Sequence, residues 1–303
     1  MANKDQGHYP VQNTVMFDTQ AGTGFQIAEI NRGLSGLNRR LYRQNRVYRV
    51  KVDLIGDQPN KVDVYALRDT YMLHQAYALA MKEWNESFDD ADEVVRSENI
   101  GRWRDFRVAT AAFIGDIALN PQVLAAQGPK VLAGTVQIDE WQNSVSYNSA
   151  GSVRDFGLFA DANTFGILDE YDLKGNVIRS PTTATAAAAY GELKSDLHDG
   201  EVVNLQEAGN EPPYDSDSSS PYAVLEYIGT IYVGSNGEQK TSTGFFDAPL
   251  GAVYLSGLGS EVDNIYSVTA PTDKPKLFKV TAQKGDYKGV AAREYVDAKK
   301  LGA

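Results

Sequence analysis

The sequence contains no cysteine, so disulfide bonds, thiolate metal sites and a cysteine nucleophile are all excluded. No apolar run approaches the roughly 18 residues that a membrane-spanning helix needs. The N-terminal segment lacks the continuous apolar stretch of a secretory signal peptide. We therefore expect a soluble protein that is made in the cytoplasm and is indifferent to its redox environment.

The usual catalytic motifs are also missing. The sequence has no phosphate-binding loop, no nucleophile elbow and no zinc-protease motif. Gly22-Thr23-Gly24 is not preceded by a strand pattern, as a nucleotide-binding loop would be. The three histidines are His8, His74 and His198. Only His198 has acidic neighbours in the sequence, and adjacent ligands in a polar turn are more typical of a solvated loop than of a metal site.

Acidic residues leave one catalytic alternative open. Asp215 and Asp217 resemble half of a calcium loop, but the central glycine and the downstream glutamate are missing. Asp169, Glu170 and Asp172 could supply the paired carboxylates of a glycoside hydrolase, since only their separation in space matters. We expect no enzyme activity, no cofactor and no bound metal, with an Asp/Glu-dependent hydrolase as a remote alternative.

The chain does contain a concentrated basic segment. Seven basic residues and no acidic residue lie between Arg32 and Lys51, in a chain of 303 residues with a net charge of −11. Arginine binds phosphate in a bidentate manner, and the interleaved tyrosines offer stacking faces, so contact with nucleic acid is one interpretation. The other is ion pairing within the chain or across a subunit contact, which the acidity of the protein favours. The basic strip that we assign comprises Arg39, Arg40, Arg43, Arg46, Arg49 and Lys51.

Hydrophobic periodicity predicts a strand pair followed by a long helix. Alternation over 46–54 and again over 62–66, with turn residues between them, indicates a β-hairpin. Helical spacing of apolar residues predicts a helix over 70–88, with Asp69 or Thr70 as its N-cap. A second helix is expected in the alanine-rich segment 182–197.

Short strand patterns recur through the rest of the chain. They are separated by turns rather than helices, which favours an antiparallel β-sandwich over a parallel sheet. The expected strands lie at 103–108, 131–138, 156–160, 164–168, 222–233, 241–246, 251–256, 262–268 and 276–281. We divide the chain into an N-terminal arm (1–30), a β body (31–284) that allows two halves split near 150, and a C-terminal tail (285–303).

Several segments resemble major capsid proteins of small DNA viruses and bacteriophages built on the viral jelly roll. They are LYRQNRVYRVKVDL, VYALRDTYMLHQAYALAMKEW, GRWRDFRV and TGFFDAPLGAVYL, together about a third of the chain. The resemblance implies a mainly β fold of eight strands in two facing sheets, as a single jelly roll with large insertions or as a double one, with about two inserted helices. Many such proteins also carry an arginine-rich N-terminal arm, whereas residues 1–30 contain only Lys4 as a basic residue.

The function that this resemblance implies is structural. We expect a self-assembling major capsid protein that forms an icosahedral shell and is located in the virion after synthesis in the host cytoplasm. Its partners would be copies of itself and other virion proteins, with packaged nucleic acid as a further partner through the basic strip. The alternative is a non-catalytic β-sandwich binding module, such as a spike, a fibre or a carbohydrate-binding domain.

Overall fold

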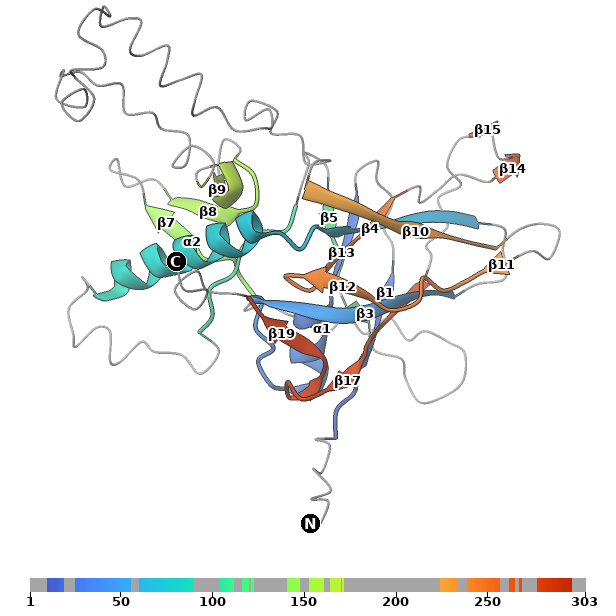
Figure 1. The fold of residues 1–303 in the computed structure, drawn as a ribbon, viewed down its shortest axis with the longest axis horizontal. Coiled ribbons are helices and arrows are strands. Elements are labelled where there is room, and N and C mark those ends of the chain that lie inside the picture. Colours follow the sequence, from blue (N-terminus) through green and yellow to red (C-terminus); the bar gives the residue numbers. More distant parts are fainter. Residues whose placement is uncertain are drawn as a thin grey trace, which may run out of the picture.

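The computed structural model shows a mainly β protein in which most strand pairs are antiparallel (Figure 1). The structure describes residues 10–18, 25–55, 60–89, 104–111, 116–119, 121–122, 141–147, 153–160, 164–169, 171, 224–233, 239–256, 262–264, 267–268 and 277–295. Two six-stranded sheets form the body of this described part, and smaller strand groups accompany them.

The first large sheet, sheet A, has the strand order β12-β3-β16-β1-β6, and β19 also pairs with β3. Its longest strand is β3, which is ten residues long and pairs with β12, β16 and β19. The strand bounds are β1 Thr14–Asp18, β3 Arg46–Ile55, β6 Pro121–Gln122, β12 Phe246–Pro249, β16 Leu277–Ala282 and β19 Ala292–Glu294.

The second large sheet, sheet B, has the strand order β11-β10-β4-β13-β2-β5. Strand β4 lies at its centre between β10 and β13, and the short β5 joins β2 as a parallel edge. The strand bounds are β2 Gln26–Glu29, β4 Asn60–Leu67, β5 Ile117–Ala118, β10 Leu225–Val233, β11 Gln239–Lys240 and β13 Ala252–Ser256.

The eight principal strands pair in a nested fashion. The outermost pair along the chain is β1 with β16, followed inward by β2 with β13, β3 with β12 and β4 with β10. Successive pairs of this series alternate between the two sheets. Both sheets therefore combine strands from before and after residue 150.

Alternation of side chains explains why the two sheets bury one common core. Along β3 the side chains of Tyr48, Val50, Val52 and Leu54 belong to this core, whereas Arg49 is exposed. Val62 and Val64 of β4 enter the same core from the other sheet. The expected strands over 46–54 and 62–66 are confirmed as β3 and β4. The expected hairpin between them is wrong, because the two strands face each other across the core from different sheets and each pairs with strands from later in the chain.

Two helices pack on this framework. Helix α1 (Ile30–Asn38) directly follows β2 and places Ile30 and Leu34 in the core between the sheets. Helix α2 (Tyr71–Asp89) follows β4, and the Thr70 hydroxyl accepts a 3.3 Å hydrogen bond from the backbone N–H of Leu73, as an N-cap does. The expected helix over 70–88 and its cap are thus confirmed.

A second core lies on the outward face of sheet B. There Leu73, Ala76, Tyr77 and Ala80 of α2 pack against side chains that include Ile27 and Tyr254 of the sheet. A three-stranded sheet contributes Phe156 to this core, and Figure 1 shows it beside α2. Its strands are β7 Val145–Tyr147, β8 Val153–Gly157 and β9 Thr164–Gly166. The inserted helix and this small sheet therefore cover one end of sheet B.

Two short hairpins complete the described strands. Strands β14 (Val262–Asn264) and β15 (Ser267–Val268) pair with each other. Strands β17 (Lys284–Gly285) and β18 (Gly289–Val290) form a tight hairpin between β16 and β19.

The structure corrects the predicted N-terminal arm and the predicted C-terminal tail, because both contain strands. Residues 14–18 and 26–29, which we assigned to an N-terminal arm, are strands β1 and β2, because Val15, Phe17, Ile27 and Ala28 are buried. Residues 284–294, assigned to a tail from 285 onward, contain β17, β18 and β19, and β19 extends the pairing along β3. The flanking residues 1–9 and 296–303 lie outside the described residues.

The other expected elements differ in outcome. Strands over 222–233, 251–256 and 276–281 match β10, β13 and β16, whereas 156–160 and 164–168 match β8 and β9 only in part. The expected strand at 241–246 overlaps β12 only at Phe246. Residues 104–108 are irregular rather than a strand. The expected strand at 131–138 and helix at 182–197 lie outside the described residues.

Candidate functional site

The basic strip begins where α1 ends and runs through a loop into β3. Arg39 takes a left-handed backbone conformation (φ 49°) at the end of the helix, and both Arg39 and Arg40 are exposed. Arg43 lies in the loop, while Arg46, Arg49 and Lys51 lie on β3. The strip is therefore not one continuous cationic surface, because it changes from a helix end to a loop to a strand face.

Four members of the strip contact carboxylates of the same chain. Arg49 lies 3.1 Å from Asp247, Lys51 lies 3.3 Å from Asp53, and Arg43 lies 4.0 Å from Asp105. Arg46 forms an ion pair with Glu294 of β19. These contacts agree with the interpretation of the strip as ion pairs within the chain.

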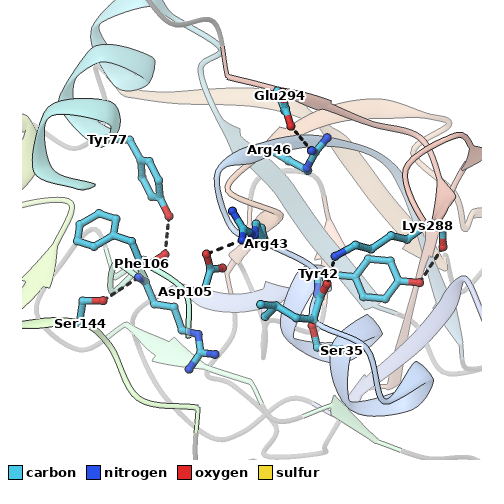
Figure 2. A network of polar contacts seen from close by, with 12 residues as sticks. Ser35, Tyr42, Arg43, Arg46, Tyr77, Asp105, Phe106, Ser144, Lys288 and Glu294 are labelled. Atoms are coloured by element: carbon cyan, nitrogen blue, oxygen red, sulfur yellow. Dashed lines mark hydrogen bonds and ion pairs between the residues drawn. The ribbon is translucent and has the colours of Figure 1, made fainter. Parts of the chain in front are cut away.

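The hairpin of β17 and β18 holds the loop of the strip against the sheet (Figure 2). The Arg46 guanidinium lies 3.6 Å from the ring centre of Tyr287, a cation–π geometry. The Tyr287 hydroxyl accepts a 3.1 Å hydrogen bond from the Arg43 backbone, and the Tyr42 hydroxyl donates to the Lys288 carbonyl at 2.9 Å. Lys288 donates to the Leu41 carbonyl. The hairpin thus fixes the loop through both side chains and backbone.

A chain of ionic contacts links sheet A to helix α2. Asp247 of β12 lies between Arg49 of β3 and Arg293 of β19, at 3.1 Å and 3.9 Å. Arg293 also pairs with Asp69, whose other oxygen lies 2.7 Å from His74 Nε2 in α2. Because Arg49, Asp247 and Arg293 are each more than two-fifths exposed, water screens these contacts and each contributes little to stability.

A buried polar cluster lies below the loop, around the irregular segment 104–110. Side chains, and not neighbouring strands, form many of the hydrogen bonds to the backbone of this segment. The Gln44 amide accepts from the Val108 N–H at 2.7 Å and donates to the Val108 carbonyl at 2.9 Å. Tyr77 donates to the Phe106 carbonyl at 2.6 Å, and Ser144 accepts from the Arg107 N–H at 3.0 Å (Figure 2).

Ionisable side chains of this cluster are removed from water. Burial raises the pKa of the Glu29 carboxyl above its ordinary value, and the Thr110 hydrogen bond and the nearby Arg32 and Arg107 oppose that shift. Burial likewise raises the pKa of Asp105, opposed by Arg43 and Arg107. The Arg107 guanidinium also lies 4.0 Å from the ring centre of Trp141. The cluster is therefore a mutually compensating set of charges under the loop of the basic strip.

The remaining sequence candidates take other positions. His74 is buried, contacts Asp69 and stacks on Tyr295 at 4.1 Å. Asp169 accepts a hydrogen bond from the Ala160 backbone. Gly22-Thr23-Gly24, His8, His198, Glu170, Asp172, Asp215 and Asp217 lie outside the described residues. Among the residues that the structure describes, no three His, Cys, Asp or Glu side chains group as a metal site, and no helix is long and apolar enough to cross a membrane.

Sequence reasoning missed the distant partners of the basic strip. Asp247, Tyr287, Lys288, Arg293 and Glu294 are separated from it by some two hundred residues or more, and no spacing rule links them. The only available signal was the alternation of β3 itself, which placed Arg49 and Lys51 outward, where a neighbouring strand could supply carboxylates. The buried Glu29 and Asp105 carry no sequence signal at all.

Comparisons with known proteins return no identification: no family model matches the sequence, and neither the curated proteins nor the solved structures yield a match.

Proposed function

We propose that this chain is a virion structural protein, a self-assembling major capsid protein with a single jelly roll that forms an icosahedral shell. The observation that carries the proposal is the nested pairing of its eight principal strands. A jelly roll is a long antiparallel hairpin, four strands against four, wrapped so that alternate strand pairs enter two facing sheets. Viral capsid domains are a main group built in this way.

The strand order supports this winding in detail. Numbered along the chain, the principal strands are β1, β2, β3, β4, β10, β12, β13 and β16, from first to eighth. The order within sheet A is then first, eighth, third, sixth, and within sheet B second, seventh, fourth, fifth. That is the arrangement which wrapping four nested pairs around one core produces. It favours the single jelly roll with large insertions over the double one.

The position of the insertions is also consistent with a shell protein. The segment between the fourth and fifth strands, β4 and β10, runs from Arg68 to Val224 and includes α2 and the three-stranded sheet. Among its described residues, α2 and the three-stranded sheet pack on sheet B, β5 and β6 pair with β2 and β1 at sheet edges, and the nested pairs are intact. Large insertions between strands are what the sequence resemblance to jelly-roll capsid proteins implies.

For the basic strip, the proposal assigns a structural role ahead of genome contact. Arg43, Arg46, Arg49 and Lys51 already contact carboxylates, so a phosphate would have to displace those partners. Arg46 also lies on the ring of Tyr287. The strip thus positions the loop and β3 within the sandwich.

Electron microscopy of the purified protein tests the proposed function. Negative-stain images and sedimentation velocity should show closed shells or regular capsomers over a range of protein and salt concentrations. A protein that remains monomeric at high concentration under all these conditions would overturn the proposal.

The second candidate is a carbohydrate-binding module, because lectin domains share the same winding. It would remain a monomer or small oligomer and would be retained on a glycan array. Regular assemblies without retention on the array would exclude it.

A further inference from the structure

Among the residues that the structure describes, the outward face of sheet B has a covered end and an open end. Helix α2 and the three-stranded sheet cover the end that contains Tyr254. Beyond them, β4, β10 and β11 carry a row of polar and aromatic side chains on the same face. We call this open end the tyrosine face; it consists of Lys61, Asp63, Tyr227, Thr230, Tyr232 and Lys240.

The strand register places these side chains together. Thr230 lies opposite Asp63 and Tyr232 opposite Lys61 in the pairing of β10 with β4. Tyr232 also lies opposite Lys240 of β11. Since Val62 and Val64 point into the core between the sheets, Lys61 and Asp63 and the residues opposite them point outward. The side chains of the tyrosine face therefore stand next to one another on one surface.

The two tyrosines are exposed, and one of them is held in a fixed position. Tyr227 is 56% and Tyr232 is 36% exposed. The Tyr227 hydroxyl lies 2.5 Å from the Thr230 hydroxyl, which in turn donates to the Asp63 carboxylate. The ring of Tyr227 also packs edge-on against Tyr65 at 5.5 Å. A side chain held in this way loses little further freedom when a partner binds.

We propose that the tyrosine face binds a second copy of this chain in an isologous contact, an inference that rests on the self-assembly proposed above. The charge of the face is the first argument. It carries Lys61 and Lys240 against Asp63 within a chain of net charge −11. Two copies that meet through this face therefore avoid the repulsion that two acidic surfaces would cause at close range.

The mixture of signs supports a two-fold contact. In an isologous contact each patch meets its own rotated image, so a patch of one sign would repel itself. Here a two-fold rotation can bring the lysines of one copy towards Asp63 of the other. Exposed tyrosine is enriched at protein interfaces, because its ring supplies apolar area and its hydroxyl a hydrogen bond.

The contact uses the face of the sheet and not its edge. Strand β11 pairs with β10 only at Tyr232 and Val233, and between Tyr227 and Gly229 the register of β10 shifts, so the uncovered part of β10 is irregular. Irregularities of this kind hinder the addition of a further strand at an edge. A small molecule is a poor fit as well, because its sites are concave, whereas these side chains project from adjacent strands of one sheet.

Two pairs of variants test the inference. Tyr227→Ala with Tyr232→Ala should raise the protein concentration needed for half-maximal assembly about tenfold or more, as loss of central interface tyrosines does. Tyr71→Ala is the matched control, because Tyr71 is 59% exposed but lies at the start of α2. It should change that concentration by less than about twofold.

The second pair tests charge with the same change of net charge in both variants. Lys61→Glu makes the tyrosine face acidic and should also suppress assembly. Lys82→Glu replaces an exposed lysine of α2 and should not. Sedimentation velocity and negative-stain microscopy report assembly, and circular dichroism verifies that all four proteins are folded.

The outcomes separate this inference from the proposed function. If the unaltered chain assembles and all variants assemble like it, the tyrosine face is not a subunit contact, although the proposed function stands. If the unaltered chain never assembles, both are overturned. If the double tyrosine variant assembles normally but loses retention on a glycan array, the face binds carbohydrate and the inference is wrong.

Discussion

At the scale of single residues, the hydroxyls of tyrosines in the two cores donate hydrogen bonds to irregular backbone segments. Tyr48 donates to the Arg43 carbonyl at 2.5 Å, Tyr77 to Phe106 at 2.6 Å and Tyr254 to Thr110 at 2.7 Å. The rings of these three tyrosines are fully buried. The abundance of tyrosine was visible in the sequence and indicated half-buried strands and interfaces. Its use inside the cores could not be predicted, because the acceptors lie in segments without periodicity.

The buried Glu29 leads to a prediction about pH. Its raised pKa means that the folded chain holds the proton more tightly than the unfolded chain, so the free energy of unfolding falls as pH rises from the unfolded pKa through the folded one. Glu29→Gln keeps an oxygen that can accept from Thr110 and removes this titration. We expect the variant to lose less stability than the unaltered chain between about pH 4 and pH 7.

Urea unfolding at several pH values measures the effect. Asp105 shifts in the same direction and remains in both proteins, so a residual slope is expected. Glu86→Gln is the control, because Glu86 lies exposed on α2 beside Lys82. Parallel pH profiles for the unaltered chain and Glu29→Gln would contradict the prediction.

At the scale of secondary-structure elements, segments with strong hydrophobic periodicity were predicted correctly. Elements that depend on tertiary packing were not. The apolar alternation of β3 and β4 and the helical spacing of α2 are local, so these elements were found. Helix α1 was not, because its nine residues include two glycines and its helicity depends on packing. Ile30 and Leu34 enter the core between the sheets, and burial outweighs the weak propensity.

Gly33 of α1 provides a test of that packing. A β-carbon at this position would lie 2.5 Å from Val15 Cγ1 of β1, which is too close. Alanine normally stabilises a helix by about 1 kcal/mol relative to glycine. We expect Gly33→Ala instead to lower the free energy of unfolding, because overpacking costs about 1–3 kcal/mol.

The double variant Gly33→Ala with Val15→Ala identifies the cause. Removing the two methyl groups of Val15 should relieve the contact, so the two substitutions should couple favourably by more than about 0.5 kcal/mol in a double-mutant cycle. Additive losses in chemical denaturation would show that the close approach of α1 to β1 is not the reason.

At the scale of the whole molecule, charge dominates the behaviour in solution. The net charge of −11 makes copies repel one another at long range, while the polar surface of sheet A is nearly balanced by its own ion pairs. The net charge follows from composition alone. The ion pairs of sheet A depend on which strands become neighbours. Hydrophobic periodicity indicates which side chains face inward, but not which strands pair.

Salt should therefore promote the proposed assembly. Raising the ionic strength from about 0.05 M to about 0.5 M shortens the Debye length severalfold and screens the repulsion between copies. We expect the protein concentration at which light scattering detects assembly to fall over this range. A rise in that concentration would show that attraction between opposite charges, not repulsion, dominates the approach of two copies.

The nested strand pairing also determines when the protein can fold during its synthesis. Thr14 pairs with Thr281 and Gln26 with Leu255, so the first two strands lack their partners until almost the whole body has left the ribosome. Strands β3 and β4 likewise pair with strands that begin at Leu225 or later, whereas α2 and the β7–β8 pair can form early from neighbouring residues. Closure of such long loops is slow and leaves apolar strands exposed meanwhile. A nascent chain of this design has to be protected from aggregation until its last strands arrive.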